Sequence, residues 1–288
     1  MNGVINVIKP PAMSSSGVVV FLKGLLHEKR IGHAGTLDPG AAGVLPVLVG
    51  RSTRLSDLLM SCGKEYVGEV FFGAATDTLD SYGSISEVCE CSISEDDFKS
   101  ALSYFYGEIM QVPPVYSAVK IDGVASYKLA RNGKAKNKPE RSVFIYAAEF
   151  LRKTGENRFL FRVKCSKGTY IRVLAAEIGK RLGVPAHLSF LLRTESGTQR
   201  IENSYTIDEL KEMSVAGNFS FIIPPEKIDL GLPILNINAD DAEKLKNGVS
   251  VSVDCEKYGP LFSLYSDNEY LGVGEKNGEK IRIKISLY

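Results

Sequence analysis

Cysteine is scarce in this sequence, and its few copies follow no metal-binding spacing. Cys62, Cys89, Cys91, Cys165 and Cys255 are odd in number, widely scattered and form no CxxC pair. Disulfide frameworks and structural zinc sites use paired cysteines at short, regular spacings. The sequence therefore predicts reduced thiols and no metal site, and Cys89-Glu90-Cys91 is interpreted as an incidental pair.

Long apolar runs are absent as well. No stretch approaches the roughly 18 apolar residues that span a bilayer. Met1–Pro11 lacks the basic start and apolar run of a signal peptide. We therefore expect a soluble cytoplasmic protein with no membrane association.

The chain has little net charge, since 35 basic residues stand against 34 acidic ones and leave +1. A nucleic-acid binder is usually strongly basic, so the whole-chain charge argues mildly against that class. Residues 119–141 differ, because seven basic side chains against Asp122 and Glu140 give a local charge of +5. Such a segment either is a solvated loop, which the residues alone favour, or neutralises phosphates. Its basic members are Lys120, Lys128, Arg131, Lys134, Lys136, Lys138 and Arg141.

The remaining composition is that of a folded protein, with 288 residues of which 44% are hydrophobic. This length fits one large domain, or a large domain with a small one. Apolar periodicity predicts helices over Gly17–His27, Ser94–Gly107 and Tyr170–Leu182. β-Branched and aromatic content predicts strands over Gly43–Gly50, Tyr66–Gly73, Ser142–Leu151 and Arg158–Cys165.

The C-terminal part has a different texture from about Pro224 onward. Asp240–Asn247 is helical in pattern, and the rest consists of short β-prone runs separated by turns such as Asn-Gly. The sequence therefore predicts a small β-rich C-terminal domain.

The segment Arg30–Pro39 should be a loop, because glycines punctuate it, and it carries one carboxylate at a restrained position. Pro39 holds Asp38 in an extended conformation. Asp-Pro is also a common turn opener whose carboxylate satisfies its own backbone, and this turn interpretation is the one that the residues alone favour.

Gly32–Gly50, read as GHAGTLDPGAAGVLPVLVG, resembles the signature of the TruB family of pseudouridine synthases, which modify the T-loop uridine of transfer RNA. Further blocks match that family in the same order. They are NVIKP (6–10), KEY (64–66), GAATDTLDSYG (73–83), QVPPVYSAVK (111–120), KGTYIR (167–172) and LLR (191–193). Ala34, Gly40 and Ala42 depart from the family's commoner threonine, leucine and threonine.

The resemblance implies an α+β fold: a catalytic domain (residues 1–230) with a central, largely antiparallel sheet, then a small C-terminal β-barrel (231–288) that resembles a PUA RNA-binding domain. It implies isomerisation of uridine to pseudouridine at position 55 in the T stem-loop of tRNA. No metal, cofactor or protein partner is implied, and a monomer is expected.

The resemblance also assigns roles to single residues. Asp38 corresponds to the catalytic aspartate, Arg172 to the arginine that pairs with it, and Tyr66 to the aromatic that stacks on the base. Tyr170 and Leu191 correspond to further base contacts, and His33 to a contact with the RNA. Without the resemblance, Tyr66 and Leu191 are interpreted as core residues and Tyr170 as a first-turn helix residue. Asp77 and Asp80 are interpreted as turn and capping residues.

Three alternatives remain open at this stage. The chain could act on another RNA, because related enzymes share the aspartate loop. It could assist tRNA folding without catalysis. The glycine-rich loop could also bind phosphate, although no GxxxxGK[ST] or GxGxxG pattern supports a nucleotide enzyme.

Overall fold

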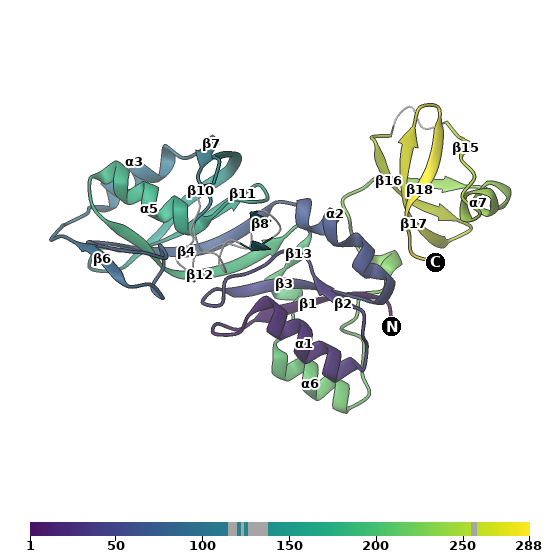
Figure 1. The fold of residues 1–288 in the computed structure, drawn as a ribbon, viewed down its shortest axis with the longest axis horizontal. Coiled ribbons are helices and arrows are strands. Elements are labelled where there is room, and N and C mark those ends of the chain that lie inside the picture. Colours follow the sequence, from purple (N-terminus) through teal and green to yellow (C-terminus); the bar gives the residue numbers. More distant parts are fainter. Residues whose placement is uncertain (115–119, 122–123, 126–137, 255–257) are drawn as a thin grey trace.

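The computed structural model spans residues 1–288, and the structure is described for all of them except 115–119, 122–123, 126–137 and 255–257 (Figure 1). Two separate β-sheets organise it, one large and one C-terminal. Within the described residues, no helix is long and apolar enough to cross a membrane.

The large sheet has nine strands, seven of them in the order β1-β3-β12-β4-β11-β10-β7. All neighbours in this order are antiparallel except β12 and β3, so the expected largely antiparallel sheet of an α+β protein is confirmed. The order comprises β1 (Gly3–Lys9), β3 (Ala42–Val49), β12 (Ala186–Ser196), β4 (Lys64–Phe72), β11 (Arg158–Cys165), β10 (Arg141–Gly155) and β7 (Gly107–Gln111). The short strands β2 (Ile31–His33) and β13 (Gln199–Arg200) pair with β3 and β12.

Two helix pairs cover different ends of this sheet (Figure 1). α3 (Glu95–Ser103) and α5 (Ile171–Leu182) pack on β4, β10, β11 and β12, whereas α1 (Ser15–Leu26) and α6 (Ile207–Val215) pack near β1. Strand β4 alternates strictly between buried and half-buried residues, as a strand with one face on a core must. Tyr66 therefore faces the core beneath α3 and α5.

A two-stranded hairpin brings its loop against strand β12 of the large sheet. It consists of β5 (Ala74–Thr76) and β6 (Ile85–Val88), joined by residues 77–84. The loop forms an isolated bridge between Asp80 and Leu188 of β12. Leu188 N also donates a hydrogen bond to Leu79 O at 3.0 Å. Asp80 thereby comes close to the Asp38 loop, which is far away in the sequence.

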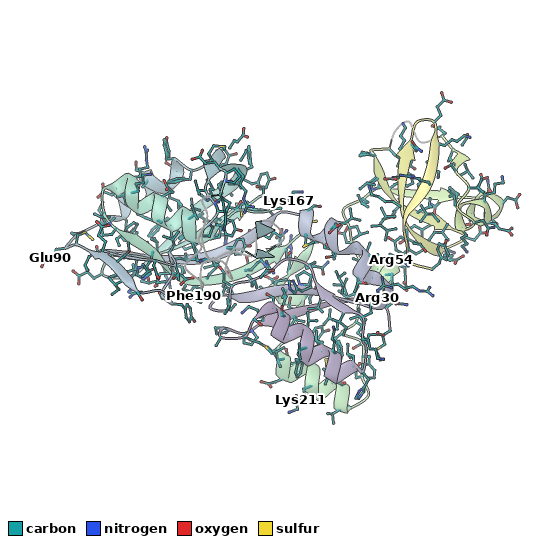
Figure 2. The ribbon with its side chains drawn as sticks, viewed as in Figure 1. Arg30, Arg54, Glu90, Lys167, Phe190 and Lys211 are labelled. Atoms are coloured by element: carbon teal, nitrogen blue, oxygen red, sulfur yellow. The ribbon has the colours of Figure 1, made fainter. Side chains whose placement is uncertain are left out.

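The C-terminal part is a curled five-stranded sheet in the order β14-β16-β17-β18-β15, and α7 (Ala239–Lys246) packs against it. Its strands are β14 (Ile234–Ile237), β15 (Val251–Ser252), β16 (Leu261–Ser266), β17 (Glu269–Asn277) and β18 (Lys280–Ser286). Arg54 Nη1 donates to Ser286 O at 2.9 Å, which joins this sheet to the segment after β3 (Figure 2). The sheet bears out the β-rich prediction, whereas its PUA-like character and the boundary at residue 231 stay predictions.

Short elements complete the described chain. They are α2 (Ser56–Ser61), the 3-10 helices η1 (Gly50–Leu55), η2 (Ile201–Asn203) and η3 (Pro225–Lys227), and a two-stranded sheet of β8 (Lys120–Ile121) and β9 (Val124–Ala125).

The predicted helices and strands are all present, with two corrections. The helix expected over Ser94–Gly107 begins after its Ser94 N-cap but ends at Ser103, because the chain turns into β7 at Gly107, whose φ is 96°. The loop expected over Arg30–Pro39 begins with strand β2, because Ile31–His33 pairs with β3. The remaining residues, Ala34–Pro39, lie between β2 and β3.

Candidate active site

The loop that carries Asp38 is fixed on both sides of this residue. The Ser15 hydroxyl donates to Leu37 O at 3.1 Å and accepts from Leu37 N at 2.9 Å. Pro39 O accepts from Lys9 Nζ at 3.2 Å and from Ala12 N at 2.9 Å. With both neighbours held, the Asp38 backbone has little freedom, as the following proline predicts.

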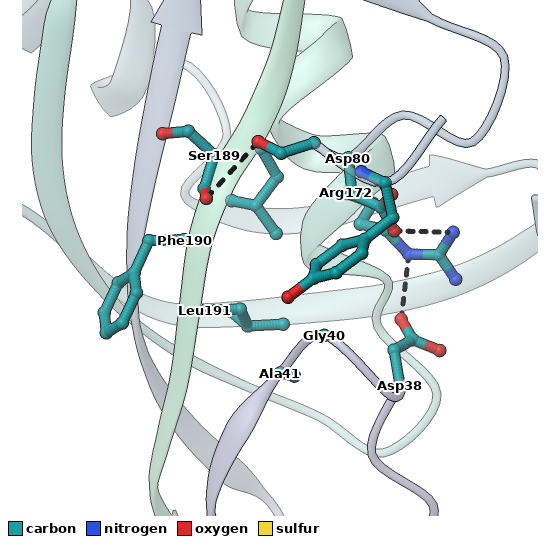
Figure 3. Close-up of a pocket in the computed structure, with 11 residues that line it drawn as sticks. Asp38, Gly40, Ala41, Asp80, Arg172, Ser189, Phe190 and Leu191 are labelled. Atoms are coloured by element: carbon teal, nitrogen blue, oxygen red, sulfur yellow. Dashed lines mark hydrogen bonds and ion pairs between the residues drawn. The ribbon is translucent and has the colours of Figure 1, made fainter. Parts of the chain in front are cut away.

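Arg172, the second residue of α5, brings Asp38 and Asp80 together. Its Nε lies 2.8 Å from Asp38 Oδ2, and its Nη1 lies 3.5 Å from Asp80 Oδ2 (Figure 3). Nη1 also donates to Thr78 O at 2.8 Å. The arginine side chain is 5% exposed and the Asp38 side chain 40% exposed, so a buried cation presents the carboxylate toward solvent. The predicted pairing of Asp38 with Arg172 is present in the structure.

Burial raises the pKa of Asp38 above its usual value, and the charge of Asp80 raises it further. Arg172 and Lys9 oppose this rise but do not overcome it. Arg172 therefore offsets the desolvation of Asp38 only in part. A carboxylate with a raised pKa is a stronger base than an ordinary aspartate, which suits a group that must attack or accept a proton.

The pocket over this ion pair draws its lining from four parts of the chain. Asp38, Arg172 and Leu191 line it together with Gly40, Ala41, Asp80, Ser81, Tyr82, Leu188, Ser189 and Phe190 (Figure 3). Its free volume is about 30 Å³, which is room for one or two water molecules. Three of the six residues singled out from the sequence thus share one pocket.

Tyr66 lies beneath the pocket and does not line it. It is 9% exposed and belongs to the same apolar cluster as Leu37 and Ala41, and Leu191 packs against that cluster. Burial raises the pKa of its hydroxyl, and nearby Arg193 opposes the rise. The side chain is therefore adjacent to the Asp38 loop, as the resemblance implies, but it is also a core residue.

Tyr170 lies at the start of α5, where a first-turn position was predicted. Its backbone N donates to Gln111 Oε1 at 3.0 Å, and the Arg141 guanidinium lies 4.7 Å from its ring centroid. Arg141 also donates to Gly168 O, and Lys138 is buried and donates to Pro114 O. These two basic side chains of the 119–141 segment thus contact protein groups, whereas Lys128, Arg131, Lys134 and Lys136 lie outside the described residues.

His33 is the last residue of strand β2, shortly before Asp38 in the sequence, and is half-buried. Its Nδ1 has no hydrogen-bond partner within the described part of the chain. Burial lowers the pKa of the ring, and the positive charge of Arg193 lowers it further. The imidazole is therefore neutral near pH 7 and carries a buried nitrogen that can accept or donate.

Arg193 is a functional candidate that sequence reasoning passed over. It is 1% exposed, and it donates from Nε to Val44 O at 2.7 Å and from Nη2 to Gly35 O at 3.1 Å. It therefore ties the loop around Asp38 to β12. The only signal was its place in the LLR block, because an arginine after an apolar run does not reveal whether it is buried.

Two buried lysines add positive charge behind the same loop. Lys9 is fully buried, and burial lowers its pKa to about 8. Lys64 is 6% exposed, and burial lowers its pKa to about 8 as well. Each donates to backbone carbonyls, Lys9 to Pro10 O and Met13 O and Lys64 to Met60 O.

Asp80 was interpreted as a turn residue, but it also pairs with Arg172. Its Oδ1 accepts from the Thr78 hydroxyl at 2.6 Å and from Tyr82 N at 3.0 Å, which are turn hydrogen bonds. Its Oδ2 faces Arg172. Asp77 does behave as a turn residue, accepting from Ser84 N at 2.8 Å. No group of three or more potential metal ligands occurs among the residues that the structure describes.

Comparison with known proteins gives consistent results. The model of the TruB family pseudouridylate synthase N-terminal domain matches residues 23–171. A protein of Caldanaerobacter subterraneus subsp. tengcongensis, named tRNA pseudouridine synthase B, is 41% identical over 286 residues, covering 99% of this chain and 98% of that protein. Its namesake from Streptococcus thermophilus is 39% identical over 288 residues, covering 97% and 96%.

A solved structure shares the whole fold. The crystal structure of a Cbf5-Nop10-Gar1 complex contains a chain with a TM-score of 0.75 and 29% identity, covering 98% of this chain and 84% of that one. The fold and the near full-length similarity define a pseudouridine synthase, an enzyme of the isomerase class. Within that class, the chain belongs to the TruB family.

Proposed function

We propose that this enzyme converts a uridine of tRNA to pseudouridine, with Asp38 as the catalytic carboxylate. The observation that carries the proposal is the Asp38–Arg172 ion pair at 2.8 Å, facing a pocket in a chain of the TruB family. The names of the relatives, tRNA pseudouridine synthase B, support tRNA as the substrate.

The chemistry requires a base, a nucleophile or both, and side chains of this protein can supply these groups. The N1–C1′ glycosidic bond breaks, the uracil turns, and a C5–C1′ bond forms while C5 loses a proton and N1 gains one. Substrate and product contain the same atoms, so we propose that neither a metal nor a cofactor takes part. Asp38 acts as nucleophile or base, for which its raised pKa suits it.

Arg172 holds Asp38 in position and keeps part of its population ionised. Its Nη1 is anchored to Thr78 O, so the Nε that meets Asp38 has a fixed direction. A buried, oriented cation costs no reorganisation when charge develops in the transition state. We therefore assign it to positioning and electrostatic stabilisation.

The target base must leave its stack before its glycosidic bond becomes accessible. We propose that Tyr66 and Leu191 contact the flipped uracil, since both adjoin the Asp38 loop. Tyr170 contacts the base from the start of α5. His33 contacts the RNA, and its neutral imidazole makes it a hydrogen-bonding group and not a charge partner.

Four finer assignments are part of the proposal. The uridine is that at position 55 in the T stem-loop. Residues 1–230 form the catalytic domain, and residues 231–288 form a PUA-like domain that binds RNA. The enzyme acts as a monomer without a protein partner. It acts in the cytoplasm, where tRNA substrates are found.

Pseudouridine mapping in an unmodified tRNA transcript tests the proposal directly. The transcript is incubated without cofactors with the wild-type protein and with Asp38→Asn. We expect the wild type to convert one T-loop uridine, and Asp38→Asn to bind the transcript without converting it. Conversion by Asp38→Asn would refute the role of Asp38, and binding without conversion by the wild type would favour an RNA-folding role.

A further inference from the structure

Tyr82 combines a position in the active-site pocket with an unusual degree of exposure. It lines the pocket with Asp38 and Arg172, yet it is 69% exposed. Its ring lies against Gly40, where a Cβ would come within 2.0 Å of Tyr82 Cε2 and 2.7 Å of Cζ. One side of an aromatic ring therefore covers the catalytic loop, while much of the rest is in solvent.

The backbone beneath Tyr82 is held firmly, although its side chain is not. Tyr82 N donates to Asp80 Oδ1, and Ser84 N donates to Asp77 Oδ1. Gly83, between them, has no room for a side chain, since a Cβ there would lie 2.3 Å from Thr78 Oγ1. The loop thus presents an aromatic ring from a fixed base.

The enclosed part of the pocket is too small for a pyrimidine. Its free volume of about 30 Å³ holds one or two waters, so a lining side chain must move before a uracil can approach Asp38. Arg172, Leu188 and Ala41 are each less than 5% exposed and packed in place. Tyr82 is packed against Gly40 but is 69% exposed, more than Phe190, the other exposed aromatic of the lining, at 45%. We therefore expect the displacement of Tyr82 to cost the least.

We propose that Tyr82 covers the catalytic pocket in the free enzyme and, on binding, moves off Gly40 to stack on an unpaired nucleobase of the RNA. The inference rests on the proposed function and extends it with a substrate-contacting residue. Aromatic side chains on which splayed bases stack are the general means of holding single-stranded RNA, and they are tolerant of base identity. Tyr82 offers such an aromatic ring beside the pocket that is proposed to receive the flipped base.

The absence of tryptophan from this chain gives a direct assay, because Tyr82→Trp creates a single indole. We expect its fluorescence to be quenched when unmodified tRNA is added, in the wild-type background and with Asp38→Asn, which removes turnover. Tyr106→Trp is the matched control, since Tyr106 is 66% exposed and does not line the pocket. Equal quenching in the two variants, or none in Tyr82→Trp, would overturn the proposal.

Binding measurements supply the second test. Tyr82→Ala should raise the Kd for tRNA about tenfold, the loss of one stacked base. Tyr82→Phe keeps the ring and should restore the affinity. An unchanged Kd in Tyr82→Ala would exclude stacking. These readouts report binding alone, so a wild-type enzyme that forms no pseudouridine would refute the proposed function and leave the role of Tyr82 to be judged separately.

Discussion

Replacing Arg172 by methionine tests the central ion pair, because methionine keeps an apolar stem and removes the guanidinium. The change deletes a charged hydrogen bond to Thr78 O and the contacts with Asp38 and Asp80. A fully buried pair broken in this way costs about 3–5 kcal/mol. Since the Asp38 and Asp80 side chains are 40% and 20% exposed and can be hydrated, we expect a loss of about 2–3 kcal/mol.

The same substitution should change the rate and its pH dependence. Burial and Asp80 already raise the pKa of Asp38, and Arg172 is the first of the groups that lower it. Without Arg172 the pKa rises further, so the acid limb of activity moves to higher pH. The loss of one oriented electrostatic partner typically lowers kcat by about 10²–10³.

Urea unfolding and single-turnover pseudouridine formation across pH measure both effects. Arg172→Lys is the matched control, because it retains a charge without the fork that reaches Thr78 and Asp38 together, and it should recover part of the rate. The double variant Asp38→Asn/Arg172→Met measures how much of the stability loss is due to the interaction between the two side chains. If its stability loss equals the sum of the single losses within about 0.5 kcal/mol, the two groups are uncoupled and the reasoning is wrong.

Three further predictions follow from the site and the sequence. Because burial raises the folded-state pKa of Asp38, its ionisation costs stability as pH rises above the usual aspartate range. Asp38→Asn should therefore gain stability relative to the wild type in urea unfolding as pH rises from about 4 to 8, and a constant difference would contradict this. Gly43→Ala should lower the free energy of unfolding by about 3 kcal/mol or more in thermal unfolding, because φ is 109° and a Cβ would lie 2.1 Å from Arg193 O. Gly40→Ala is the control: its Cβ meets the movable Tyr82 ring and should cost less than about 1 kcal/mol. Neutralising Lys128, Arg131, Lys134 and Lys136 should weaken tRNA binding and flatten its salt dependence, and an unchanged slope would show a merely solvated segment.

The sequence predicted the local features of the site well, because short-range rules determine them. Pro39 after Asp38 indicated a restrained carboxylate, and the helical pattern over Tyr170–Leu182 placed Tyr170 and Arg172 in a first helical turn. The burial statistics of strand aromatics indicated that Tyr66 is a core residue, and the alternating burial of β4 in the structure agrees with this. The pairing of Asp38 with Arg172 came from the resemblance alone, since no spacing rule joins a loop to a helix so far along the chain.

The unpredicted features depend on contacts between distant segments. Asp80 satisfies every rule for a turn residue, and only the bridge from its loop to Leu188 brings it to Arg172. Arg193 follows two leucines and could equally have been exposed. Its burial depends on the parallel pairing of β12 with β3, where Gly43 leaves no space for a side chain. Such tertiary contacts leave no periodic trace in the sequence.

The low net charge of this chain shows why composition is a poor guide to this active site. Around Asp38 the structure gathers Arg172, Lys9 and Arg193, all nearly or fully buried, and each is bound to backbone carbonyls of the surrounding loops. Charges fixed in this way hold the loop, and Arg172 and Lys9 act on the Asp38 carboxylate. Because Asp38 and Asp80 balance much of their charge, the cluster adds little to the field that RNA meets at long range. The cations that shape the chemistry are therefore inside the protein, whereas attraction of the tRNA must come from surface groups. The two contributions can be separated by adding salt. Turnover at saturating RNA should be insensitive to added salt, while tRNA binding should weaken.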